Sequence, residues 1–269
     1  MKTIHNPNPY IILGVHRSGT TLMSGIFTRA GIFMGKNQNV NKEAVFFYRL
    51  NNKALLENKS TAYDFDIFLE KLNNPEFVNQ LTEKFKKELS LNLNTNFFGY
   101  KNLIKYRFSA NKIKWGFKDP RNVLLYPVWN NIFPNAKYLI IFRNPVDVCI
   151  STYYFEQKRY QKKLKKRPGL KFGMPLEKAF DVWKKFNKML LKIAENKTNT
   201  LAVKYEDLKT EEVIDKIIEF TGSPIKQKEI NNMIKDKPNN YKLPEGYNQL
   251  IDLVKNDDLV QKLYPNLKF

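Results

Sequence analysis

Four short apolar runs stand out along the chain and predict β-strands at 10–13, 114–117, 138–142 and 200–204. The third run, YLIIF, contains no polar position, which is typical of a strand buried on both faces of a parallel sheet. Between the runs, apolar residues recur at helical spacing at 21–30, 146–154 and 176–195. Strands that alternate with helices predict an α/β fold with a doubly wound, mostly parallel sheet.

The remaining segments are expected to fit around this sheet. Residues 42–96 have a mostly helical pattern and are too long for a simple crossover, so we expect a helical insertion that helps to cover a site. A Gly-Ser-Pro sequence at 222–224 ends a further helix. The tail, about 236–269, is polar with scattered aromatic residues, and it either packs as an arm or is partly mobile. We expect residues 1–269 to form one domain.

The first strand is followed by a turn that has the layout of a phosphate-binding loop. Gly14 and Gly19 have the spacing of the G-x-x-x-x-G-K-[ST] loop that binds nucleoside triphosphates, but Thr20 stands where that loop has its lysine. In such a turn the backbone N–H groups and the positive end of the helix dipole face an anion.

Side chains of the same loop add hydrogen-bond donors. Arg17 brings a full charge on a planar fork that suits oxyanions, and hydroxyls come from Ser18, Thr20 and Thr21. Ordinary capping of a helix by Ser or Thr is the alternative, but capping alone does not account for six such loop residues in a row. We therefore expect this loop to bind an anion.

A second anion-binding group is expected after the third strand. Arg143 follows YLIIF at the carboxyl end of that strand, where ligands bind in open α/β sheets. Ser151, two turns into the next helix, can converge with it on one phosphate; pairing of Arg143 with Asp147 is the alternative. Because the strand ends in Arg rather than a metal-binding carboxylate, and the loop lacks its lysine, the anion is expected not to need Mg²⁺.

Together these motifs resemble those of the sulfotransferases that use 3′-phosphoadenosine 5′-phosphosulfate (PAPS). RSGTTL at 17–22 is similar to the loop of that family for the 5′-phosphosulfate, and Arg143 with Ser151 is similar to its 3′-phosphate motif. FKDPR at 117–121 and VKYEDL at 203–208 resemble the branch that includes tyrosylprotein sulfotransferases and many bacterial members. The resemblance spans most of residues 10–222, with one departure: His16 stands where the family commonly has proline.

The resemblance implies an enzyme that moves a sulfuryl group from PAPS to an acceptor hydroxyl, on a carbohydrate, peptide or small molecule, without a metal. By position the general base is Glu43, with His16 as the alternative, while Lys118 and Arg17 steady the charge on the transferring group. The donor-binding residues implied in this way are His16, Arg17, Ser18, Gly19, Thr20, Thr21, Leu22, Arg143, Ser151 and Tyr205.

Several neighbouring residues are expected to be structural. Asp119 and Arg121 are expected to form a pair that holds their loop, with Pro120 fixing the turn. Trp115 and Trp183 are expected in the core, and the acids at 206–207 are expected to cap the following helix.

The net charge of +20 favours anionic partners, although lysine is abundant throughout the chain. The densest stretch, 156–171, holds eight Lys or Arg residues against one acid, Glu156. It is expected to form a lid over the nucleotide, a platform for an acidic acceptor, or a solvated basic loop. Lys158 and Arg159 are its candidates for contact with the 3′-phosphate. The charge suggests an anionic glycan or an acidic peptide as acceptor.

Two other functions remain open at this point. A divergent P-loop kinase or NTPase would use ATP, with Arg17 in place of the lysine. A nucleic-acid-binding protein would also suit the charge, but no pattern of a known nucleic-acid-binding fold is visible, so we expect no nucleic-acid partner.

Location is indicated by what the sequence lacks. The single cysteine, Cys149, cannot form an internal disulfide, and it and the two histidines show no metal-site spacing. No apolar run approaches the roughly 20 residues of a membrane helix, and the start has no apolar segment of a signal peptide. We expect a cytoplasmic protein, although a lumenal catalytic domain without its anchor would look the same.

Overall fold

The structure is a computed structural model that describes residues 7–107, 113–166, 173–196, 198–234 and 243–267. Its centre is a parallel sheet of four strands in the order β2-β1-β3-β4. The strands are β1 (Tyr10–Leu13), β2 (Gly116–Lys118), β3 (Lys137–Phe142) and β4 (Thr200–Lys204). This sheet confirms the predicted fold class.

The second strand lies further along the chain than predicted. Trp115 pairs with Phe33 through an isolated bridge, so the ladder with β1 begins only at Gly116 and continues to Lys118. The strands approach closely at Gly116 because glycine has no Cβ: an added Cβ would lie 2.3 Å from the carbonyl oxygen of Tyr10. The shift places Lys118 at the carboxyl end of its strand.

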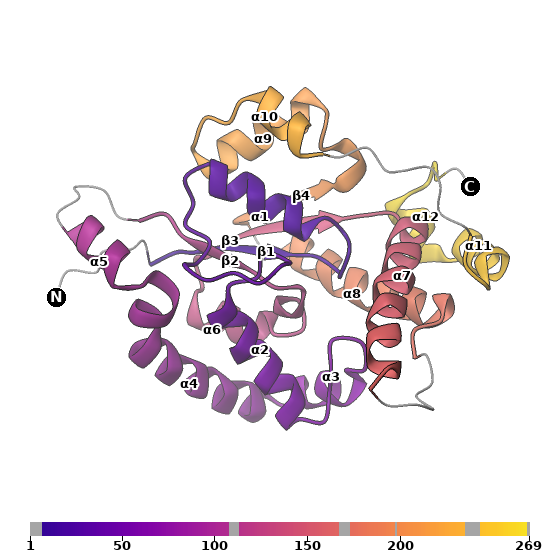
Figure 1. The fold of residues 1–269 in the computed structure, drawn as a ribbon, viewed down its shortest axis with the longest axis horizontal. Coiled ribbons are helices and arrows are strands. Elements are labelled where there is room, and N and C mark those ends of the chain that lie inside the picture. The colour runs from indigo at the N-terminus through magenta and orange to yellow at the C-terminus, as the bar shows by residue number, and fades with distance from the viewer. Residues whose placement is uncertain (1–6, 108–112, 167–172, 197, 235–242, 268–269) are drawn as a thin grey trace.

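The sheet is covered on both faces (Figure 1), and side chains of β1 alternate between the two cores. Tyr10 and Ile12 face one core, with α1 (Thr20–Arg29) and α9 (Glu211–Thr221), and α10 (Gln227–Met233) lies nearby. Ile11 and Leu13 face the other core. That core is built with α6 (Tyr126–Ile132), α8 (Leu176–Asn196) and the insertion.

The predicted insertion is indeed mostly helical. It comprises α2 (Val45–Glu57), α3 (Asp66–Leu72), α4 (Pro75–Asn92) and a π-helix, η1 (Leu93–Phe98), and α5 (Tyr100–Arg107) follows. Asn74 caps α4 by accepting a hydrogen bond from the backbone N–H of Glu76, and Pro75 occupies the first turn, where its missing N–H costs nothing. Phe47 of α2 stacks on Phe117 of β2 with ring centroids 3.8 Å apart, which fixes the insertion against the sheet.

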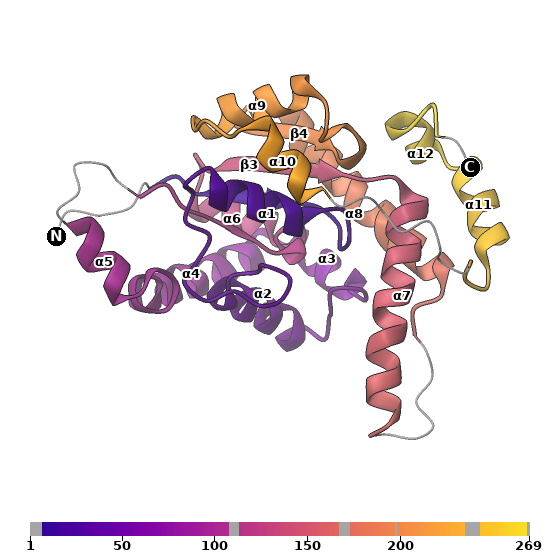
Figure 2. The same ribbon diagram turned by 45° about the horizontal axis from the view of Figure 1, so that its top comes forward.

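The helix after β3 is longer than the sequence pattern indicated. It is α7 (Pro145–Leu164), so residues 156–164 of the basic stretch continue a helix and do not form a loop. Residues 167–171 of that stretch lie outside the described part of the chain. In Figure 2 the second half of α7 extends away from the body of the protein. The apolar positions thin out after Phe155, which is why sequence periodicity ended the helix too early.

The tail packs as an arm over residues 243–267, while 235–242 and 268–269 lie outside the described residues. It forms α11 (Tyr247–Lys255) and α12 (Asp258–Leu263). Leu250 and Val254 are buried among residues of the larger core. Among the described residues, no helix is both long and apolar enough to cross a membrane. The assignment of residues 1–269 to one domain stays a prediction.

Candidate functional site

A cavity of about 420 Å³ lies at the carboxyl ends of the strands. In the order β2-β1-β3-β4, the chain leaves β1 toward one side of the sheet and β3 toward the other, so the loops after these two strands flank the switch point where α/β sheets bind ligands. The cavity is lined by His16, Arg17, Gly19, Thr20, Thr21, Leu22, Asn41, Glu43, Tyr63, Lys118, Pro120, Arg143, Phe155, Tyr205 and Met233.

The loop after β1 is tightly wound. Arg17 and Gly19 both have positive φ, 69° and 104°, and Gly19 stands at the N-terminus of α1. Positive φ is uncommon outside glycine and is often held in place at functional sites. No side chain caps α1. Capping by Ser or Thr, the alternative considered above, therefore does not explain this loop, and the N-terminus of α1 faces the cavity.

Tyr205, which directly follows β4, packs against the loop at Gly19. Its ring lies under the Arg143 guanidinium, whose central carbon is 4.2 Å from the ring centroid. A Cβ at Gly19 would come within 2.5 Å of the same ring. Glycine is therefore needed at 19 for two reasons, its backbone conformation and the close approach of Tyr205.

Arg17 lies along α7. Its Nε donates to Ser151 Oγ at 3.0 Å, and its guanidinium lies over the ring of Phe155, 5.0 Å from the centroid. Ser151 and Phe155 are four residues apart and so share one face of the helix. The carbonyl oxygen of Arg17 accepts a hydrogen bond from Arg143 Nη1 at 2.9 Å. Ser151 thus contacts Arg17, and the convergence of Ser151 with Arg143 on one phosphate stays a prediction.

Glu43 and Lys118 form an ion pair in the lining of the same cavity. Lys118 Nζ lies 3.5 Å from Glu43 Oε1 and donates to the carbonyl oxygen of Asn41 at 2.6 Å. Asn39 donates its side-chain amide to Glu43 Oε2 at 2.6 Å. The hydroxyl of Thr21 also donates to the Asn41 carbonyl, so the segment that carries Glu43 is tied to both α1 and β2. Glu43 and Lys118 are 4% and 1% exposed.

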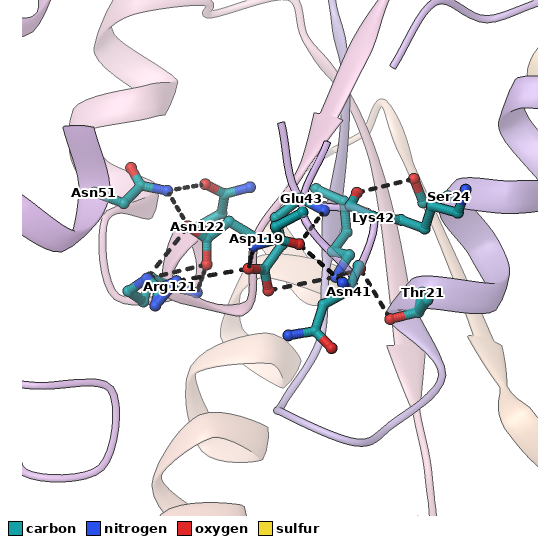
Figure 3. A network of polar contacts seen from close by, with 11 residues as sticks. Thr21, Ser24, Asn41, Lys42, Glu43, Asn51, Asp119, Arg121 and Asn122 are labelled. Atoms are coloured by element: carbon teal, nitrogen blue, oxygen red, sulfur yellow. Dashed lines mark hydrogen bonds and ion pairs between the residues drawn. The ribbon is translucent and has the colours of Figure 1, made fainter. Parts of the chain in front are cut away.

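A buried network lies behind this pair. Asp119 and Arg121 form an ion pair at 3.2 Å, which confirms their predicted structural role. Asn51 of α2 donates to Asp119 Oδ2 and Asn122 Oδ1, so the insertion holds the loop after β2 (Figure 3). Arg121 Nη2 also lies 3.9 Å from Glu43 Oε2, which links the network to the cavity wall.

The electrostatics of the cavity are dominated by cations. Burial lowers the pKa of Lys118 from its ordinary value, although the nearby Glu43 and Asp119 act in the opposite sense. Burial also lowers the pKa of His16 well below its ordinary value, and the charges of Arg121, Lys118 and Arg17 lower it further. His16 is therefore neutral near pH 7.

The cavity unites most of the residues that the sequence singled out. Ser18 and Ser151 are not among those that line it: Ser18 is fully buried and its hydroxyl has no hydrogen-bond partner among the described residues, and Ser151 is hydrogen-bonded to Arg17. Sequence reasoning missed Asn41, Tyr63 and Phe155, which do line it. Phe155 could have been found from its spacing of four residues after Ser151. Tyr63 comes from the insertion and has no local signal.

The chain belongs to the sulfotransferase domain family, whose model matches residues 7–241. This result confirms the family and the enzyme class that the sequence motifs predicted, and it does not favour the kinase alternative. A curated relative, the 3-beta-hydroxysteroid sulfotransferase of Cavia porcellus, is 29% identical over 139 residues, which is 47% of each protein. The chain thus spans about half the length of that relative.

Two solved structures to which this chain is similar are sulfotransferases. The sulfotransferase from Alicyclobacillus acidocaldarius aligns over 97% of both chains with a TM-score of 0.51 and 12% identity. The sulfotransferase domain of the Synechococcus PCC 7002 olefin synthase aligns over 98% of this chain and 90% of that domain, with a TM-score of 0.49 and 18% identity.

Proposed function

We propose that this protein transfers a sulfuryl group from PAPS to an acceptor hydroxyl. The observation that carries the proposal is the convergence of the uncapped N-terminus of α1 with Arg17, Lys118 and Arg143 on one cavity. Such a site suits a ligand with more than one anionic group.

The loop residues fit the donor. The N-terminus of α1, with Arg17, Gly19, Thr20, Thr21 and Leu22, would hold the 5′-phosphosulfate, and Arg143 would hold the 3′-phosphate. Arg143 Nε and Ser18 Oγ are buried and have no hydrogen-bond partner in the described part of the chain, as expected of polar atoms near an anion site. When bound, the donor supplies an activated sulfuryl group on a phosphate leaving group. Ser151 contributes by fixing Arg17, and Tyr205 by supporting Arg143.

Glu43 is the group that we assign as the base. It lines the cavity beside Lys118, so one wall offers both a proton acceptor and a charge that stabilises developing negative charge. His16 is the weaker candidate, because a proton on its imidazole would add positive charge beside Arg17, Lys118 and Arg121. The catalytic set is therefore Glu43, Lys118 and Arg17.

The donor is tested by calorimetric binding of 3′-phosphoadenosine 5′-phosphate beside AMP and Mg–ATP. We expect the 3′-phosphate to strengthen binding, and Arg143→Ala to remove most of that gain, about 10- to 100-fold, because a charge-assisted contact is lost. Arg29→Ala, at the far end of α1, is the control and should bind like the wild type. Indifference to the 3′-phosphate, or preference for Mg–ATP, would refute the proposal.

The acceptor is proposed to be anionic, on the basis of a ridge of lysines along α7 and just beyond its end. With 3.6 residues per turn, the two ridge residues inside the helix, Lys158 and Lys162, lie within about 20° of the direction of Ser151, on the face that includes Phe155 of the cavity lining. At 1.5 Å per residue they extend about 17 Å from Ser151, and the other two ridge residues follow the last residue of α7. All are exposed, and among the described residues none forms an ion pair with an acid. The ridge consists of Lys158, Lys162, Lys165 and Lys166.

Charge reversal of the whole ridge to glutamate should weaken binding of an anionic acceptor about tenfold or more, since each exposed pair contributes up to about 1 kcal/mol. The matched control carries four Lys→Glu changes at other exposed sites, Lys87, Lys101, Lys188 and Lys228, and has the same net charge. A glutamate-rich peptide and a carboxylated oligosaccharide serve as probes, titrated at two salt concentrations. Equal losses in both variants would mean that only net charge matters, and the ridge would then have no specific role.

Two further proposals concern metal dependence and location. The reaction is expected to need no metal, because the loop and strand end differ from those of Mg²⁺-dependent P-loop enzymes. The cytoplasmic location suggested by the cysteine content also stays a prediction.

A further inference from the structure

The C-terminal segment, residues 243–267, lies entirely beyond the family match, which ends at residue 241. It is nonetheless anchored firmly. Asp257 caps α12 by accepting hydrogen bonds from Leu259 and Val260, and it also pairs with Lys184 of α8 at 3.4 Å. These contacts fix the residue that follows α12, Tyr264.

Tyr264 packs against the end of β4. It is 8% exposed, its ring lies 5.0 Å from Lys204 Nζ, and its hydroxyl donates to Glu206 Oε2 at 3.5 Å. Burial and the charge of Glu206 raise the pKa of Tyr264, so its hydroxyl keeps its proton and acts as a donor. Lys204 and Glu206, the two residues that Tyr264 contacts, directly precede and follow Tyr205, whose ring lies against the Arg143 guanidinium.

The sequence suggested that Glu206 caps the helix that follows it, but the cap of α9 is Thr210. Glu206 Oε1 accepts two hydrogen bonds from Asn144, one from the backbone N–H at 3.0 Å and one from the side-chain amide at 2.8 Å. Asn144 directly precedes α7 and, with Arg143, connects it to β3. A carboxylate that accepts both bonds fixes the position and the side-chain orientation of Asn144 together.

Asn144 passes this orientation to the residue that precedes it. Its amide donates to Asp147 Oδ2 at 3.0 Å, and its own oxygen accepts from the Asp147 backbone at 2.9 Å. The same oxygen, Asp147 Oδ2, lies 3.4 Å from Arg143 Nη2. The contacts thus run without a gap from Tyr264 through Glu206, Asn144 and Asp147 to the Arg143 guanidinium.

We propose that Glu206 and Tyr264 are positioning residues for the Arg143 anion site, and that the C-terminal segment is therefore a working part of this site. The inference rests on the proposed function, because it takes Arg143 as the group that holds the 3′-phosphate. Without Glu206, Asp147 and Asn144 lose their common alignment, and the guanidinium is no longer fixed for its ligand.

The test measures how much the 3′-phosphate strengthens binding, as the ratio of the dissociation constants of AMP and 3′-phosphoadenosine 5′-phosphate. This ratio, the gain, is compared across matched variants. Glu206→Ala should reduce this gain between about two- and tenfold, as expected for the loss of one or two hydrogen bonds. Glu206→Gln keeps an oxygen for Asn144 and should retain most of it. Tyr264→Phe should lower the gain less than Glu206→Ala. The controls are Glu219→Ala on α9 and Tyr247→Phe on α11.

A double-mutant cycle then separates positioning from packing. If Tyr264 acts through Glu206, Tyr264→Phe has no further effect in the Glu206→Ala background, whereas independent packing effects would add. Additive losses, or equal weakening of AMP and of the 3′-phosphorylated ligand, would overturn the inference.

Hydrogen exchange supplies a readout that needs no donor. The Asn144 amide N–H, which donates to Glu206, should exchange faster in Glu206→Ala and unchanged in Glu219→Ala. Unchanged exchange would overturn the inference even if donor binding behaved as expected. A wild type that does not prefer the 3′-phosphate would instead count against the proposed function, and the exchange result would still decide the contact network.

Discussion

Glu43→Gln is expected to lower kcat by about 10²–10⁴-fold, the usual contribution of a positioned general base. The carboxylate lies in the cavity wall, 3.5 Å from Lys118 Nζ and 2.6 Å from the Asn39 amide. Glutamine keeps the size of the side chain and one oxygen for Asn39, but it cannot accept the acceptor proton. The measurement is the rate at which 3′-phosphoadenosine 5′-phosphate is released in the presence of a hydroxyl acceptor.

The control for this variant is Glu57→Gln, at the end of α2, where the glutamate pairs with Lys84 on the surface. It should leave kcat unchanged. Donor binding is measured in parallel, because Glu43 is buried between cations and its loss could disturb the wall. Full kcat in Glu43→Gln would exclude Glu43 as the base, and an effect on donor binding as large as that on kcat would indicate a structural role.

Lys118→Met is expected to lower kcat by about 10²–10³-fold, the range for loss of one charged or polar group that stabilises the transition state. Methionine retains the apolar stem of lysine, so the buried volume is nearly kept. Lys114→Met is the control: its Nζ donates to the carbonyls of Thr221 and Gly222 at the end of α9, so we expect lower stability with little change in kcat.

The pH dependence gives an independent check on Lys118. Burial lowers its pKa below the ordinary value of 10.5. The charged form, which the mechanism needs, is thus present below this lowered pKa and is lost as the pH rises through it. We expect kcat to fall on the alkaline side at a pH below 10.5, and this fall to be absent from the residual activity of Lys118→Met. An identical alkaline limb in both proteins would assign it to another group.

The sequence predicted the strands well where apolar runs are unbroken. YLIIF and the run at 10–13 became β3 and β1, because strands buried on both faces leave no room for polar residues. The prediction was less accurate for β2, which is displaced toward Lys118 by the bridge between Trp115 and Phe33. That bridge joins residues 82 positions apart, and local periodicity carries no signal for it.

The part of the cavity that we propose binds an anion could also be predicted from the sequence. The loop at 14–22 and Arg143 follow neighbouring parallel strands, and the carboxyl ends of such strands meet at one edge, so their convergence follows from topology. Other residues that line the cavity could not be predicted in this way. Tyr63 and Asn41 come from long connections, whose course depends on packing against the rest of the molecule.

By itself, the sequence determined the α/β class, the family and the backbone of the anion loop, because these depend on local patterns of apolar residues, glycines and hydroxyls. Only the tertiary structure decided that Ser151 contacts Arg17, that Glu206 contacts Asn144, and that Tyr264 of the C-terminal segment contacts Glu206. Each of these contacts joins residues between 58 and 134 positions apart. Hydrogen bonds of this kind form only after folding has brought distant segments together at the carboxyl ends of the strands. No local sequence pattern could therefore have predicted them.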